Sequence, residues 1–351
     1  MAEKQRLYQY DVVRSVAILF VVAVHSLVVV DQSSTVCAWY YMIFQTIFFT
    51  GNAMFFMLSG KFNLRERTDD ESVKRYYYNK ARNILVPVIV IFLLRTLYDL
   101  YPTWDFSSYA KNFVVNFVYG YSSMEYWFVF VLMGFLVVAP FLGHAFSRLS
   151  KLEIKIFVVL GLAYHLVLMI LDNRGVPLGW SFLFGGFAFT FCLGALVEKI
   201  ISTDKRFKQL ECLAVICLLI TVYLMSIGLN SDVHDKSPFY TILAVGIYMA
   251  ILRWGASRKK ESKFVSFAAK HSFSIYLVHM TILLPLTRIL PPFSGVVSLA
   301  AHLGVTVVVF ALSLLLAAVL DRLVMEPLKK LFDKSMGKLV FPKEPRRHER
   351  A

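Results

Sequence analysis

Two residues near the start of the chain could do chemistry inside an otherwise apolar segment. Arg14 and His25 lie in the stretch YDVVRSVAILFVVAVHS, residues 10–26. A permanently charged guanidinium suits the phosphates of a nucleotide or coenzyme, and an imidazole can act as a base near neutral pH. On a helix their spacing is about 20° from three full turns, so both lie on one face, with His25 about 16 Å deeper. Each alone could be structural, but the shared face favours a functional path.

A second polar group falls where the next apolar segment ends, in NAMFFMLSGK, residues 52–61. Ser59 supplies a hydroxyl, and Gly60 supplies a bare backbone that permits close approach of a ligand. Basic residues follow at Lys61, Lys80 and Arg82. Together with Arg14 they predict an anion-binding rim, although ordinary enrichment of basic residues in cytoplasmic loops is the alternative for Lys61 and Lys80. Pro87, soon after this rim, is expected to kink the following helix.

The third group lies in HSFSIYLVHM, residues 271–280. Ser272, Tyr276 and His279 are four and three residues apart, so they share one face of a helix. A hydroxyl, a phenol and an imidazole on one stripe suit a polar tunnel better than a lipid-facing surface. For His279, a structural hydrogen bond between helices is an equally good interpretation.

The elements that position these residues follow from the composition. The 351 residues are 58% hydrophobic and 17% charged, which is too apolar for a soluble domain of this length. The formal net charge of +14 does not indicate nucleic-acid binding, because the basic residues form no common face or tract. We therefore predict an all-α polytopic membrane protein.

Ten apolar stretches have the length that spans a bilayer core. They cover residues 10–30, 38–60, 83–101, 125–147, 153–172, 180–200, 210–228, 238–254, 271–291 and 296–325. Of the 37 Lys and Arg residues, 31 fall in the N-terminus, in alternate loops and in the C-terminal tail. By the positive-inside rule, we expect both termini to be cytoplasmic.

Other features of the chain carry less information. The four Cys residues show neither a disulfide framework nor metal-ligand spacing, so we expect no metal site. The first span is expected to be retained, since Asp11 and Arg14 interrupt it and no small-residue cleavage site follows. We predict a single membrane domain over residues 1–335 and a basic, disordered cytoplasmic tail over 336–351.

Two further pairs of ionisable residues lie in or near spans. Asp11 could hold a partner at the inner end of the path, or pair with Arg14 or with a neighbouring loop. Arg95 and Asp99 are four residues apart, so an ion pair on one helix is the simplest interpretation.

Several motifs, taken in order, resemble the integral membrane acyltransferase-3 family. They are YDVVRSVAILFVVAVH, FFMLSG, YWFVFVLMGFLVVAP, HSFSIYLVH and the closing MEPL. The similarity extends from about residue 10 to residue 330. That family includes O-acetyltransferases of bacterial surface polysaccharides, and the sequence is most similar to the enterobacterial common antigen acetyltransferase type.

The resemblance implies a reaction and roles for individual residues. Members have about ten spans and take an acyl group, often acetyl, from acyl-coenzyme A on the cytoplasmic side of the bacterial inner membrane. The acceptor is typically a sugar hydroxyl of a surface polysaccharide or glycolipid. By analogy, His25 and Arg14 match the catalytic histidine and arginine, with Tyr276 and His279 orienting or polarising. Ser59 and Gly60, joined by Lys80 and Arg82, match the acyl-donor entrance.

The sequence also departs from the family pattern at two places. Asn83 replaces an arginine that many relatives have four residues before the proline of the third span. Glu125, near Trp127, replaces a histidine two residues before the tryptophan of the fourth span. Because Glu125 is expected at the outer mouth, Glu125 and Trp127 would meet the acceptor first.

Two other classes of function are compatible with buried ionisable residues. A transporter or flippase for a polysaccharide or lipid-linked sugar would also need a polar path, although no paired, interrupted segments are evident. A structural subunit of a synthase complex would use the same residues to join helices. The sequence does not distinguish a base from a nucleophile at His25, and it indicates neither the acyl group, the acceptor nor the oligomeric state.

Overall fold

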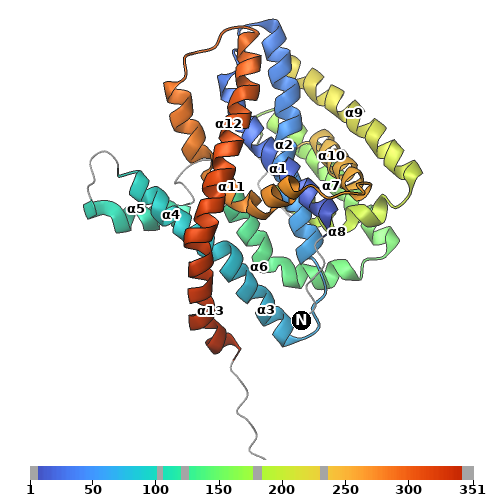
Figure 1. Cartoon of the computed structure of the whole chain (residues 1–351). Helices are drawn as coiled ribbons and strands as arrows, with labels where there is room; N and C mark the ends of the chain where they lie inside the picture. Colours follow the sequence, from blue (N-terminus) through green and yellow to red (C-terminus); the bar gives the residue numbers. More distant parts are fainter. Residues whose placement is uncertain (1–6, 101–105, 120–125, 177–183, 230–235, 342–351) are drawn as a thin grey trace, which may run out of the picture. The chain divides into compact units, whose positions relative to one another are not determined.

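The structure is a computed structural model that describes residues 7–100, 106–119, 126–176, 184–229 and 236–341. All regular secondary structure in these residues is helical, with no strand among them (Figure 1). The predicted all-α class is therefore confirmed. Long apolar segments can bury their backbone polar groups in a membrane only as helices or closed barrels, which accounts for this outcome.

The chain forms two compact units, Met1–Glu66 with Val138–Leu316, and Arg67–Val137 with Ala317–Ala351. The helices of the first unit are α1 (Tyr8–Ser26), η1 (Leu27–Val29), α2 (Thr35–Asn63), the end of α6 (Trp127–Ser147), α7 (Lys151–Asp172), α8 (Ala188–Ile200), α9 (Asp204–Ser226), α10 (Pro238–Ala256), α11 (Lys263–Ile289) and most of α12 (Val297–Leu320). The helices of the second unit are α3 (Asp70–Lys80), η2 (Ala81–Leu85), α4 (Val86–Tyr98), η3 (Phe106–Ser108), α5 (Tyr109–Tyr119), the start of α6, the end of α12, η5 (Asp321–Met325) and α13 (Glu326–Val340).

In the first unit, α1 is the central helix. It packs against α2, α10 and α11, and α2 packs in turn against α8 (Figure 1). The buried side of α1 presents Val13 and Ala17 to Met54 and Met57 of α2 and to Tyr248 of α10. Ser15 Oγ also donates a hydrogen bond of 2.8 Å to the carbonyl of Val265 on α11. The helix that carries Arg14 and His25 is thus enclosed by neighbours.

Nine helical segments in the described residues are long and apolar enough to cross a membrane. They match nine of the ten predicted spans. The tenth, 180–200, overlaps residues 177–183, which lie outside the described residues, and its described part is the 13-residue helix α8. On α9, the apolar side chains of Val215, Leu219 and Tyr223 are exposed, and their spacing of four residues places them on one lipid-facing stripe. The cytoplasmic location of both termini stays a prediction.

The contact between α2 and α8 depends on glycine. A Cβ atom added to Gly60 would lie 1.7 Å from the carbonyl oxygen of Phe191, and one added to Gly194 would lie 1.9 Å from that of Met57. Only residues without a side chain allow backbones to approach so closely. We call Gly60 and Gly194 the glycine seam.

In the second unit, two prolines follow irregular helical turns. The π-helical turn η2 ends two residues before Pro87, and η5 ends two residues before Pro327. A proline has no N–H to donate and its ring clashes with the preceding turn, so the hydrogen-bond ladder shifts there. A π-helical turn therefore lies where the kink at Pro87 is expected, and the kink itself stays a prediction. Arg95 Nε lies 3.0 Å from Asp99 Oδ1, so the predicted ion pair on α4 is also confirmed.

The predicted single domain over 1–335 stays a prediction. Helix α13 extends to Val340, five residues into the predicted tail. Residues 342–351 lie outside the described residues.

Candidate active site

The two histidines singled out in distant parts of the sequence lie together. His25, in the last turn of α1, and His279, in the middle of α11, have ring centroids 5.2 Å apart with a 41° angle between planes. His279 is fully buried and His25 is half-buried. The packing of α1 against α11 produces this pair, which periodicity within either helix could not predict.

The hydrogen bonds of His279 fix which nitrogen carries its proton. Nδ1 lies 2.6 Å from the main-chain carbonyl oxygen of Tyr276, one helical turn earlier. A carbonyl only accepts, so Nδ1 carries the hydrogen and a neutral ring keeps its lone pair on Nε2. That Nε2 atom is buried and has no hydrogen-bond partner. A buried polar atom without a partner is costly, so a group that donates to Nε2 would be favoured here.

Tyr276 and Ser272 share the buried side of α11 with His279. The Tyr276 ring lies 5.6 Å from that of His279, centroid to centroid, and Ser272 Oγ donates to the carbonyl of Ala269 at 3.0 Å. The predicted common face of these three residues is therefore present, and it is turned into the protein.

The end of α1 that carries His25 is held by α12. The amide of Leu27 turns to the carbonyls of Val24 and His25, which leaves the carbonyl of Ala23 without its usual partner in the last turn. His302 Nε2 donates to that carbonyl at 3.0 Å, while its Nδ1 lies 2.8 Å from the hydroxyl of Tyr40. His302 therefore satisfies a helix end two residues before His25.

A second link follows at the next loop. Asp31 Oδ2 accepts from the amide of Gly295 at 2.8 Å, its Oδ1 accepts from the amide of Ser33 at 3.0 Å, and its own amide donates to Ser298 Oγ at 3.0 Å. These bonds, led by that from Gly295, lower the pKa of the Asp31 carboxyl. Gly295 has a φ of +54°, a conformation that glycine adopts without strain. We call Asp31, Gly295 and Ser298 the loop clamp.

Arg14 lies on α1 together with His25, as predicted. Its Nη1 lies 3.1 Å from Oδ1 of Asp11, which is buried, and its guanidinium lies 5.3 Å from the ring centroid of Phe62. Of the alternatives for Asp11, the structure therefore shows the pair with Arg14. The Arg14 side chain remains about one-third exposed, and can present part of its guanidinium to an anion.

Beside Arg14 lies an ion pair that the sequence did not reveal. Lys61 Nζ is 2.7 Å from Glu198 Oε2 of α8, and Tyr10 donates its hydroxyl hydrogen to Glu198 Oε1 at 3.0 Å. Tyr248 packs in the same hydrophobic cluster as Tyr10. Its hydroxyl is buried without a hydrogen-bond partner. Lys61 is thus neutralised across α2 and α8.

The comparison with family models decides what kind of protein this is. Residues 7–322 match the model described as an acyltransferase domain. This match covers nearly the whole described bundle, including both histidines. The chain belongs to the acyltransferase-3 family. No curated protein and no solved structure was found to match it.

The donor-side residues of this acyltransferase-3 protein fall in different places. Ser59 is half-buried at the end of α2, and Gly60 packs against α8 in the glycine seam. The packing role of Gly60 needs no ligand, and donor binding by Ser59 and Gly60 stays a prediction.

Lys80 and Arg82 belong to the second unit. Lys80 Nζ lies 5.2 Å from the ring centroid of Tyr76, and Arg82 Nε lies 2.7 Å from Asp333 Oδ1 of α13. Tyr78 donates to the same Asp333 oxygen at 2.7 Å. Arg82 is therefore paired within its own unit, and the predicted rim that joins it to Arg14 stays a prediction.

Of the acceptor-side residues, Glu125 lies outside the described residues. Trp127 is the first residue of α6, half-buried, with its ring centroid 6.2 Å from that of Phe128. Across the part of the chain that the structure describes, no group of three His, Cys, Asp or Glu side chains is arranged to hold a metal ion.

Sequence reasoning missed Glu198, Asp31 and His302 in this acyltransferase. Each is an ionisable residue in or beside an apolar segment, which is itself a signal of a functional or structural role in membranes. Their partners, however, lie on other helices, so no local spacing marks them.

Proposed function

We propose that this membrane acyltransferase is an O-acyltransferase. It moves an acyl group, acetyl in the simplest case, from acyl-coenzyme A on the cytoplasmic side to a hydroxyl of a cell-surface or lipid-linked carbohydrate. The observation that carries the proposal is the pair of His25 and His279 in the interior of an acyltransferase bundle. Acyl transfer to a hydroxyl needs a base at the acceptor oxygen, and an imidazole is suited to that role.

The chemistry assigns distinct tasks to the two rings. In one route, His25 takes the proton of the acceptor hydroxyl, the oxygen attacks the thioester carbonyl, and the C–S bond breaks to release coenzyme A thiolate. The imidazolium then returns its proton to the thiolate. In the other route, His25 attacks the carbonyl first and the C–S bond breaks to release the thiolate; the acceptor oxygen then displaces the acyl group from His25, and the hydroxyl proton passes to the thiolate. The unpartnered Nε2 of His279 supports either route, because it can accept a hydrogen bond from a protonated or donating neighbour.

The donor is proposed to enter at the opposite end of α1. Arg14 would bind the pyrophosphate of the coenzyme, with Ser59 and Gly60 on the neighbouring α2; a donor-binding role for Lys80 and Arg82 rests on the family resemblance alone. The helical rise between Arg14 and His25, about 16 Å, is comparable to the length of a pantetheine arm, which would carry the thioester to the histidines. Glu125 and Trp127 are proposed to contact the acceptor at the outer side of a bacterial inner membrane.

The test is acyl transfer in membranes that express the full chain. Radiolabelled acetyl-coenzyme A is supplied on the cytoplasmic side, and label is followed into extracted glycan and glycolipid. We expect label with the wild type and none with His25→Ala at equal expression. His144→Gln is the matched control, since His144 is an exposed histidine of α6, and it should label like the wild type. Equal labelling by His25→Ala would refute a catalytic role for His25, and no label with any variant would refute acetyl-coenzyme A as donor.

A further inference from the structure

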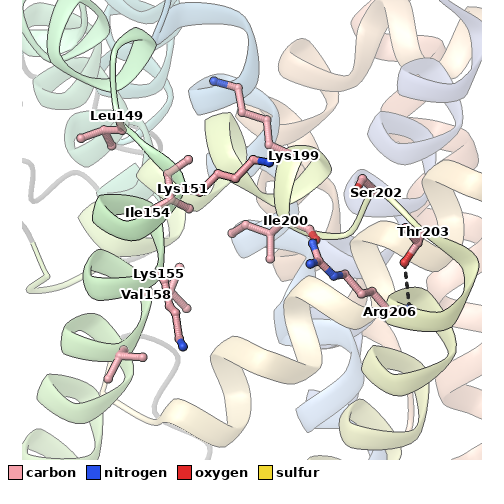
Figure 2. Close-up of a pocket in the computed structure, with 11 residues that line it drawn as sticks. Leu149, Lys151, Ile154, Lys155, Val158, Lys199, Ile200, Ser202, Thr203 and Arg206 are labelled. Carbon is pink, nitrogen blue, oxygen red and sulfur yellow. Dashed lines mark hydrogen bonds between the residues drawn. The ribbon is translucent and has the colours of Figure 1, made fainter.

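A pocket of about 650 Å³ lies between three helices of the first unit (Figure 2). These helices are not the ones that carry His25 and His279. The pocket is bounded by the start of α7, the end of α8 and the start of α9. The residues that line it are Leu149, Lys151, Ile154, Lys155, Val158, Val159, Lys199, Ile200, Ser202, Thr203 and Arg206.

The pocket has a strongly positive lining. Its charged residues are Lys151, Lys155, Lys199 and Arg206, and no carboxylate lines it. Within the described residues, none of these four cations forms an ion pair with a carboxylate. Arg206 Nη1 donates to the carbonyl of Ile200 at 2.8 Å, so its guanidinium lies beside the end of α8 (Figure 2).

The nearest carboxylates in the sequence are engaged elsewhere, and Glu198, which directly precedes Lys199, pairs with Lys61. Glu153 accepts from the amide of Ser150 at 2.7 Å, in the capping box that begins α7. Asp204 pairs with Arg253 of α10. The four cations therefore face the pocket without local neutralisation, and an anion placed there would meet net positive charge.

The pocket also has apolar lining residues, and those of α7 extend deeper than its lysines, since Lys151 and Lys155 come before Val158 and Val159. Lys151 is the first residue of this helix, which is long and apolar enough to span a membrane. Val158 and Val159 lie seven and eight residues further, about 12 Å deeper at the helical rise. Ile154 and Ile200 line the space between. The pocket thus offers charge at the end of a membrane span and hydrocarbon surface farther in.

We propose that this pocket binds an anionic phospholipid. Its phosphate lies among Lys151, Lys199 and Arg206, and one acyl chain extends along Ile154, Val158 and Val159. Basic pockets between membrane helices are the sites at which anionic head groups bind. A soluble phosphate would contact only the basic residues, whereas a lipid would contact the basic and the apolar residues. The amphipathic lining therefore favours the lipid. A lipid held there would join α7 to α8 and α9 and so stabilise the folded bundle.

The experiment uses the purified full-length protein in phosphatidylcholine nanodiscs with increasing phosphatidylglycerol. Lipid retained by the protein is measured by native mass spectrometry, and Tm is measured in parallel. The test variant combines Lys151→Gln, Lys199→Gln and Arg206→Gln, the three residues placed at the phosphate. The control combines Lys205→Gln, Lys208→Gln and Lys263→Gln, which remove the same charge from exposed residues that do not line the pocket.

We expect phosphatidylglycerol to bind the wild type and the control equally and to raise their Tm. The test variant should bind it more weakly by on the order of 100-fold, since each basic residue near an anionic surface contributes about fivefold. Lys199→Gln alone should show a smaller loss of the same kind, which keeps the test valid if the triple variant folds poorly. Val158→Gln should reduce the preference for long-chain over short-chain phosphatidylglycerol.

Three results would overturn the proposal. They are equal binding by the test and control variants, equal retention of phosphatidylcholine and phosphatidylglycerol by the wild type, and a full Tm shift from inorganic phosphate or glycerol phosphate alone. The last of these would identify a site for free phosphate rather than for a lipid.

Discussion

Three buried histidines of the first unit, His165, His279 and His302, divide into two kinds. His165 and His302 have partners at both ring nitrogens: His165 contacts Thr241 Oγ1 at 3.0 Å and the carbonyl of Phe184 at 2.9 Å, and His302 binds Ala23 and Tyr40. His279 is equally buried, but its Nε2 has no partner and its ring lies against His25. A histidine with hydrogen bonds at both ring nitrogens joins helices. A histidine with one unpartnered nitrogen near a second imidazole is available to bind a substrate. Burial alone therefore does not identify a functional histidine in a membrane protein.

The largest expected effect is at His25. His25→Ala should lower the rate of acyl transfer by about 10²–10⁴-fold, the usual contribution of a general base, while Tm changes little. Initial rates in detergent-solubilised or nanodisc protein, normalised to folded enzyme, provide the measurement. A rate within a few-fold of the wild type would remove the distinction drawn between the two kinds of histidine.

His279→Ala should have an intermediate effect. Loss of the ring beside His25 allows that side chain to move, and small misplacements of a catalytic group cost on the order of tenfold to 100-fold in rate. The pH profile of kcat/KM should also shift, because a neighbouring imidazole no longer influences His25. A purely structural role would lower Tm and leave the pH profile of the folded fraction unchanged.

His165→Ala should affect stability rather than rate. The substitution removes the partner of the buried Phe184 carbonyl and leaves Thr241 Oγ1 with its bond to the Ser237 carbonyl alone, which costs about 1–3 kcal/mol in the free energy of unfolding. Denaturant titration in mild detergent measures this loss. Activity per folded molecule should stay within a few-fold of the wild type, and a large specific loss would place His165 with His25 and His279 instead.

The smallest expected effect is at Asp31, in the loop clamp. Hydrogen bonds from Gly295 and Ser33 lower its pKa in the folded state, so its contribution to stability is present above the usual carboxyl pKa of about 3.9 and is lost as pH falls through the lower folded value. Asp31→Asn should therefore reduce Tm slightly at pH 7, and the difference should shrink below about pH 4. Thermal unfolding across this range measures it, and a difference that is constant with pH would contradict the role of the charge.

Much of this arrangement was accessible from the sequence, and the reason is periodicity. Apolar length predicted the spans, and spacing placed Arg14 with His25 on one helix and Ser272, Tyr276 and His279 on one buried face. The pairs within a helix, Asp11 with Arg14 and Arg95 with Asp99, follow from the same geometry. These are all properties of single helices.

Contacts between helices could not be predicted in the same way. The approach of His25 to His279 depends on how α1 packs against α11, and the bond from His302 to Ala23 joins residues 279 positions apart. Gly60 illustrates the limit: from the sequence alone, its lack of a side chain is interpreted as room for a ligand, whereas the structure shows that the backbone of α8 lies against it. A single sequence reveals that a glycine or histidine is exceptional in its segment without revealing its partner.

The glycine seam also affects whether water can pass between the helices of the bundle. A membrane protein with polar residues in its interior must not offer protons a continuous file of water from one side to the other. At Gly60 and Gly194 the backbones of α2 and α8 are too close to admit even a methyl group, so no water molecule fits between them. A site that handles protons, as proposed for His25, would therefore find no water path between α2 and α8 at this seam.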